Sequence, residues 1–342
     1  MKYILKIIIF LSLIFSSSCL KEDKNSIEKN LFYQSLLQKK SQFSTTNELI
    51  EWALDIKKFY LELGETKKLI RFLGELSVTE KDPLFCSFLF FLISDLYWAN
   101  DMKESSILYM MKIYRGAYFL TYENQPIGYV IALRIVNGDC SFNIKEKMYT
   151  LLLEEYKDII DIPYTLYEFA KLYKQNYDMK TAIKIMQQIV DLSSKYKNIE
   201  ENINLAEIKQ EINFYLMKKN WIYGDLKTLI NKIKYAIQTK NEFLLTQYVS
   251  KTGFKVILSQ KTNQQSWDYN DLSIGERFSD RIIFSSNLEE FSSDSEAYLK
   301  TENWNFPQMT IWYFYFKKVD YPYDEKINGG WEWKGIYFGE LF

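Results

Sequence analysis

The chain has 342 residues, of which 47% are hydrophobic and 17% aromatic, so it has enough apolar material for one large or two ordinary folded domains. Its 43 basic and 44 acidic residues nearly cancel, and charge gives no argument for nucleic acid as a partner. Because the sequence has no histidine, it has no histidine-based catalytic triad, no histidine general base and no histidine metal ligand. Because the sequence also has no glycine-rich phosphate loop and no Gly-x-Ser-x-Gly motif, we expect a protein that is not an enzyme and has no cofactor and no catalytic residues.

Residues 1–18 have the layout of a secretory signal peptide. Lys2 and Lys6 precede an uncharged apolar run over 7–15, and three serines follow this run. The run is too short to cross a hydrocarbon core, which needs about 20 apolar residues. The sequence therefore predicts a cleaved signal peptide over 1–18.

A cysteine follows the signal peptide directly. Phe15-Ser16-Ser17-Ser18-Cys19 resembles a bacterial lipobox of the relaxed, spirochaete type, although Ser16 stands where the family usually has leucine. The resemblance implies that Cys19 becomes lipidated and is the first residue of the mature chain. Because two or more acyl chains anchor a protein stably, we expect a cell-envelope protein that its lipid holds on a membrane. We expect this membrane to be the outer membrane in preference to the inner. The alternative is an ordinary secretory signal cleaved near Ser18.

Residues 19–44 are predicted to comprise the lipidated cysteine and a flexible polar tether. From 45 to 222 glycine and proline are sparse, and apolar residues recur at helical spacing, as at Trp52, Ile56 and Phe59. Thr45 and Glu48 predict a capping box. Asp82 and Pro83 are favourable as the cap and first residue of a helix that is buried on most sides.

Small residues recur within the helical part at the spacing of paired helices. Ala182 follows Ala170 by twelve residues, Tyr173 lies three after the first alanine, and the same register recurs at Ser94, Tyr97 and Ser106. This pattern resembles the tetratricopeptide repeat, with a period of about 38 residues against the family's 34. The resemblance implies an array of helical hairpins whose concave face binds a segment of a protein partner. An irregular helical bundle with tight packing is the alternative.

Residues 223–342 form a predicted second domain, since six of the eight tryptophans and seven of the twelve glycines lie from 221 onward. An apolar stripe predicts a helix over 226–237, and strands are predicted at 254–258, 281–285, 309–319 and 331–341, with Asn328-Gly329-Gly330 as a hairpin turn. Two helices followed by strands ending in Gly330-Trp331-Glu332-Trp333 resemble the NTF2-like cone fold, which implies a curved antiparallel sheet around a pocket. The predicted fold class is α+β, an all-α helical-hairpin array followed by a small α+β domain.

The aromatic residues of the second domain are the candidates for a binding surface. Aromatic faces anchor peptides and sugars, and on this ground we single out Trp304, Trp312, Tyr313, Tyr315, Trp331 and Trp333. The alternative is that they fill the core of the sheet. Because aromatic residues occupy both parities of 312–316, one face of that strand must be covered by something other than water.

Two further groups of residues have alternative interpretations. A polar cluster near residue 270 offers oxygen ligands of the kind that calcium binds: Asp268, Asn270, Asp271, Ser273 and Glu276. The order of these residues departs from that of the EF-hand loop, so we expect a solvated loop without a metal ion. Cys86 and Cys140 are able to pair as a disulfide in an oxidising compartment. Because Cys86 lies in an apolar run, we expect it to be a small buried hydrophobe instead.

The sequence thus predicts a lipid-anchored envelope protein that acts as a non-enzymatic protein-binding scaffold or adaptor. Tetratricopeptide-type lipoproteins serve in outer-membrane assembly complexes, and the resemblance implies that association here. Two alternatives remain: a surface-displayed lipoprotein that binds a ligand or host factor through its C-terminal aromatic pocket, and an enzyme that uses carboxylates or tyrosines of that pocket.

Overall fold

The computed structural model describes residues 31, 33–196, 202–258, 265–267, 272–307 and 309–339. The chain divides into two compact units, one up to Ile162 and one from Pro163. The predicted signal peptide, Cys19 and the first part of the tether lie outside the described residues, as do Asp268, Asn270 and Asp271. The prediction of a flexible tether up to residue 44 is wrong for its described part, because residues 33–39 are helical, η1 (Lys40–Gln42) follows them, and Leu36 is buried in the core of the first unit.

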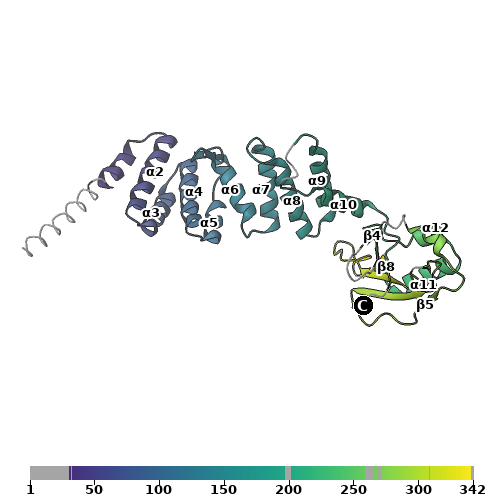
Figure 1. Cartoon of the computed structure of the whole chain (residues 1–342). Coiled ribbons are helices and arrows are strands. Elements are labelled where there is room, and N and C mark those ends of the chain that lie inside the picture. Colours follow the sequence, from purple (N-terminus) through teal and green to yellow (C-terminus); the bar gives the residue numbers. More distant parts are fainter. Residues whose placement is uncertain are drawn as a thin grey trace, which may run out of the picture. The chain divides into compact units, whose positions relative to one another are not determined.

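The first unit is built from helices that are neighbours in both sequence and space. They are α2 (Thr46–Glu62), α3 (Thr66–Thr79), α4 (Pro83–Ala99), α5 (Lys103–Met110), α6 (Ile127–Asn137) and α7 (Phe142–Glu155). Successive helices contact each other and lie side by side in Figure 1. Between α5 and α6 the chain forms a short 3-10 helix, η2 (Arg115–Ala117), and a small hairpin of β1 (Thr121–Tyr122) and β2 (Gln125–Pro126).

Local sequence signals account for where these helices begin. The capping box of α2 is present, with Thr45 and Glu48 as its two members. Asp82 caps α4 by accepting a hydrogen bond from the Leu84 amide at 2.9 Å, and Pro83 is the first helical residue. As predicted, α4 is buried on most sides, since Phe88, Leu89 and Phe91, which point to different sides of the helix, are fully inaccessible.

The small residues that recur in the sequence are fully buried among the helices. Ser94 and Ser106 are fully buried, and the Ser106 hydroxyl donates to the Ser94 carbonyl at 2.7 Å, which ties α4 to α5. Ala170 and Ala182 are also fully buried, in α8 and α9 of the second unit. A larger side chain at any of these positions would have to displace a neighbouring helix.

The second unit combines helices with a mixed sheet. Its helices are α8 (Ile162–Gln175), α9 (Met179–Leu192), α10 (Leu205–Leu216), α11 (Leu226–Gln238) and α12 (Glu242–Thr246). The strands are β3 (Lys255–Leu258), β4 (Gln265–Trp267), β5 (Ile283–Phe284), β6 (Glu296–Glu302), β7 (Trp312–Lys318) and β8 (Trp331–Phe338), with a short η5 (Ile274–Arg277) after β4. The spatial order of the strands is β4-β3-β8-β7-β6-β5, and the sheet is open.

The α+β class is confirmed, but the prediction of an antiparallel sheet is wrong at one pair. Strand β3 pairs with β8 in parallel, with Lys255 opposite Gly335, whereas the other pairs are antiparallel. A parallel pair requires a long crossover connection, and here the chain between β3 and β8 supplies it. Gly329 has the predicted positive φ of 74°, although the connection from β7 to β8 is longer than a tight hairpin.

The boundary between the two compact units does not coincide with the point where the chain changes from helices to mixed structure. Helices α8 to α10 belong to the second unit, together with the sheet. The Phe214 ring of α10 packs edge-on against the Tyr321 ring beyond β7, with centroids 4.9 Å apart. The predicted boundary at 222/223 therefore falls inside this unit, between α10 and α11.

Candidate functional site

The tryptophans predicted as a binding surface lie in the core of the second unit. Trp312 and Trp333 are fully buried, and Trp304 and Trp331 are 3% and 9% exposed. The rings of Trp304 and Trp312 stack at 3.9 Å, nearly parallel. Together with the apolar stripe of α11 they form one hydrophobic cluster under the sheet. They are therefore unavailable as a surface for a ligand, and their role is to hold helix and sheet together.

The two predicted tyrosines lie on the opposite face of the sheet, because alternate residues of a strand point to opposite faces. Tyr313 and Tyr315 are each 8% exposed. The Tyr315 ring stacks on Tyr298 at 5.0 Å and meets the edge of Tyr337 at 5.8 Å. Its hydroxyl donates to the Glu296 carboxylate at 2.7 Å. Burial raises the pKa of Tyr298 to about 12, so this face presents neutral phenols that largely cover one another.

A half-buried ion network connects four elements of the first unit. Asp95 on α4 accepts from Lys57 of α2 and from Arg134 of α6, each at 2.8 Å, and from the Tyr122 hydroxyl of β1 at 3.1 Å. Burial alone would raise the pKa of Asp95, but the hydrogen bonds and charges of Lys57 and Arg134 outweigh it and hold this pKa below its usual value. The network fixes the small hairpin against the helices.

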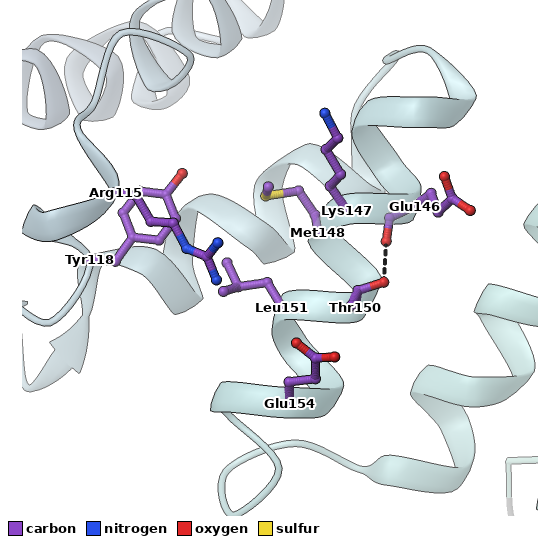
Figure 2. A pocket seen from close by; sticks show the side chains of 8 residues that line it. All are labelled: Arg115, Tyr118, Glu146, Lys147, Met148, Thr150, Leu151 and Glu154. Atoms are coloured by element: carbon purple, nitrogen blue, oxygen red, sulfur yellow. Dashed lines mark hydrogen bonds between the residues drawn. The ribbon is translucent and has the colours of Figure 1, made fainter.

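The first unit also has a groove beside α7, shown in Figure 2, which we call the α7 groove. Its volume is about 570 Å³, and it is lined by two residues of the η2 segment and six of α7: Arg115, Tyr118, Glu146, Lys147, Met148, Thr150, Leu151 and Glu154. Leu151 is buried and Met148 and Tyr118 are half-buried, whereas Arg115, Lys147 and Glu154 are exposed. The groove therefore combines an apolar floor with a rim that carries both signs of charge.

Local contacts hold the walls of the α7 groove in place. Arg115 forms an ion pair with Glu155 at 2.8 Å, which joins the η2 segment to the end of α7. The Thr150 hydroxyl donates to the Glu146 carbonyl at 2.9 Å, as drawn in Figure 2. Burial raises the pKa of the Tyr118 phenol, which keeps its proton. In Figure 2 the Arg115 guanidinium is directed toward Leu151, so the charge lies at the edge of the apolar floor.

Sequence reasoning missed the α7 groove because its two walls are about thirty residues apart in the chain. Around the groove residues Arg115 and Tyr118, four large apolar side chains are exposed: Leu108, Met111, Tyr114 and Phe119, at 65%, 53%, 59% and 68%. Exposed apolar side chains in one short segment are typical of interaction surfaces.

The remaining sequence candidates have simple outcomes. Cys86 and Cys140 are free thiols, each half-buried, and burial raises the pKa of both. Among the described residues, no cluster of acidic or cysteine side chains is arranged to hold a metal ion. Within the same ranges, no helix is long and apolar enough to cross a membrane.

Comparisons of the chain with protein-family models, with curated proteins and with solved structures found no match. The resemblances to lipoproteins, to tetratricopeptide repeats and to the NTF2-like fold therefore stay predictions from the sequence.

Proposed function

We propose that this protein is a lipid-anchored adaptor of the cell envelope, without enzymatic activity, that binds a protein partner through the α7 groove. The observation that carries the proposal is the apolar floor and charged rim of this groove on a stack of helices. The lipobox-like sequence ending in Cys19 supports the anchor, and the hairpin-like helices support the association with outer-membrane assembly that the sequence resemblance implies.

The groove favours a helix or an extended segment as its occupant. Recognition of this kind uses a few apolar anchors in a groove, and the buried Leu151 and half-buried Met148 provide a floor for them. The rim has Arg115 on one wall and Glu154 on the other, so a segment with unlike charges on its two edges would bind in one orientation.

The aromatic alternative loses its support. A surface-displayed ligand binder with an aromatic pocket would need exposed tryptophans in the second unit, and Trp304, Trp312 and Trp333 are at most 3% exposed. The adaptor proposal does not depend on these residues.

Site-specific photo-crosslinking in the full-length chain tests the proposal. A photoreactive residue at Lys147 or Thr150 should yield the same adduct with one envelope protein, and one placed at Glu51, which is exposed on α2, should not. Arg115→Glu should lower the adduct yield by about tenfold, because it places a like charge against the partner's acidic edge.

Arg71→Glu is the matched control for Arg115→Glu. Both arginines are exposed in the first unit, with side chains 83% and 73% accessible, and each pairs with one glutamate. Equal loss of adduct from the two variants, or equal adducts from the groove and from Glu51, would count against the α7 groove as the binding surface.

A further inference from the structure

A second hollow lies in the second unit, between α11 and the segment that contains α12. Its volume is about 430 Å³, and six residues line it: Thr228, Asn231, Lys232, Tyr235, Leu244 and Tyr248. We call it the tyrosine pocket. None of the aromatic residues singled out from the sequence lines it, so the burial of the tryptophans under the sheet has no bearing on this pocket.

Four of the lining residues lie on one side of α11: Thr228, Asn231, Lys232 and Tyr235. The last three follow Thr228 by three, four and seven positions, a spacing that places side chains on one side of a helix. All four are exposed, whereas the apolar stripe of α11 is buried on another side of the helix. The pattern that buries one side of α11 thus leaves a polar row that faces the pocket.

The other wall of the pocket is formed by Leu244 of α12 and by Tyr248, which lies two residues beyond that helix. Packing holds Tyr248 in place, because its ring meets the edge of the Tyr223 ring at 6.1 Å and only 7% of the residue is exposed. The Lys232 ammonium lies over the same Tyr223 ring at 5.7 Å. A wall that is already ordered loses little conformational freedom when a ligand binds.

The two tyrosines of the lining bring their phenols near each other. Tyr235 is 60% exposed, so much of its ring is accessible from the pocket. Burial raises the pKa of Tyr248, and the nearby Tyr235 phenol raises it further, so the Tyr248 hydroxyl keeps its proton. Within the described residues neither hydroxyl has a hydrogen-bond partner, and neither is sealed from solvent. Both hydroxyls are therefore available to a ligand.

The remaining polar groups of the pocket include both donors and acceptors of hydrogen bonds. The Asn231 amide has two N–H donors and a carbonyl acceptor, and no bond to another described residue occupies them. The Thr228 hydroxyl donates to the Asp225 carboxylate at 2.8 Å, so its oxygen remains an acceptor. The described lining has no carboxylate, and Lys232 is its one cation.

We propose that the tyrosine pocket binds a saccharide. Each hydroxyl of a sugar both donates and accepts a hydrogen bond, which matches the mixed donors and acceptors of Asn231 and the two phenols. The apolar C–H face of a sugar ring packs against an aromatic ring, and the exposed Tyr235 ring provides one. The volume of the pocket lies within the range of small-molecule sites, about 300–1,000 Å³.

A proline-rich peptide is the competing ligand, because such peptides also bind to aromatic-lined grooves. A proline has no backbone N–H, so a peptide of this kind presents mostly acceptors and would leave the Asn231 carbonyl and the Thr228 oxygen without partners. The saccharide fits the pocket better for this reason. The site is separate from the α7 groove, and the proposal does not rest on the adaptor function.

Saturation-transfer difference NMR on the chain from Leu20 to Phe342, which retains every described residue, tests the proposal because it detects weak ligands. The probes are the disaccharides maltose, cellobiose, lactose and N,N′-diacetylchitobiose, with decaproline as the peptide probe. At least one disaccharide should give a signal that saturates with its concentration, and decaproline should not displace it.

Variants then locate the bound sugar. Tyr235→Ala removes the aromatic surface and Asn231→Ala removes the amide, and each should weaken the affinity by about tenfold. The matched controls are Tyr177→Ala, at a tyrosine that is 71% exposed, and Asn213→Ala, at an exposed asparagine of α10. Both controls lie in the same unit outside the pocket and should stay within about twofold of the wild type.

The melting temperature separates a loss of binding from a loss of structure. Tyr235 and Asn231 are exposed on a helix, so their replacement by alanine should not lower the melting temperature. The proposal is overturned if no disaccharide gives a saturable signal, if decaproline binds more tightly than every disaccharide, or if the control variants weaken binding as much as the pocket variants.

Discussion

The ion network around Asp95 gives a sharp test of how the first unit is held together. Asp95→Asn keeps the size and one acceptor oxygen of the side chain and removes its charge. Lys57 and Arg134 then remain close together with side chains only 14% and 18% exposed. One Arg134 nitrogen already lacks a hydrogen-bond partner in the described residues, so this guanidinium has little alternative pairing.

The expected cost follows from that geometry. Removing one partner of a buried ion pair destabilises a protein by about 3–5 kcal/mol, because the other charge is left buried and unpaired. Since the network is partly accessible and the amide retains an acceptor, we expect the free energy of unfolding to fall by about 2–4 kcal/mol at neutral pH. Asp101→Asn is the control: Asp101 is 87% exposed, pairs with Lys103 at 3.4 Å, and should change the stability by less than about 0.5 kcal/mol.

The pH dependence has a definite sign. The pKa of Asp95 in the folded chain lies below its usual value, which is about 3.9 in an unfolded chain. The stabilisation by its carboxylate is therefore present above that unfolded pKa and is lost as the pH falls through the folded pKa. The stability difference between the wild type and Asp95→Asn should be constant at neutral pH and should narrow below about pH 4.

Hydrogen exchange of peptides from α4, measured across a urea series, is the appropriate assay, because the two compact units need not unfold together. A difference below about 0.5 kcal/mol at neutral pH would refute the claim that the Asp95 network stabilises the first unit. A difference that stays constant down to pH 3 would refute the carboxylate charge as its cause.

Three further predictions concern the anchor and the packing. Cys19→Ala should abolish incorporation of labelled fatty acid and shift the protein from the membrane to the soluble fraction, and retention on the membrane would contradict the lipobox. Trp312→Ala should lower the free energy of unfolding by about 3–5 kcal/mol in urea titration, whereas Phe243→Ala, at a residue 78% exposed on α12, should change it by less than about 0.5 kcal/mol. Ala182→Leu should lower the free energy of unfolding by about 1–3 kcal/mol, because Ala182 is fully buried. Ala206→Leu is the control, since it alters an exposed alanine of α10. Equal stability of the two variants would show that Ala182 is not closely packed.

Features governed by neighbours in the sequence could be predicted. The capping box at Thr45 and the Asp82-Pro83 start of α4 need only residues three positions apart or fewer, and both are present. The apolar stripe of α11 is likewise a local pattern, and Leu229, Ile233 and Ile237 form its buried face.

Features that depend on distant segments could not be predicted in the same way. The parallel pairing of β3 with β8 joins residues about eighty positions apart, and neither strand has a pattern that names its partner. Strand β6 was missed because the residues that it buries include the small Ala297 and the polar Thr301, which give a weak alternation. The α7 groove likewise arises where separate elements meet.

The aromatic run of β7 shows how residue type resolves an ambiguity that periodicity leaves open. Both parities are aromatic, so the pattern alone assigns neither face to the core. The structure directs Trp312, Phe314 and Phe316 to the helix-covered face and Tyr313 and Tyr315 to the other. A phenol has an apolar ring and a polar tip, which lets Tyr315 pack against Tyr298 while its hydroxyl reaches Glu296. Around Tyr315 the outer face is thus covered by neighbouring tyrosines of the same sheet, Tyr298 and Tyr337.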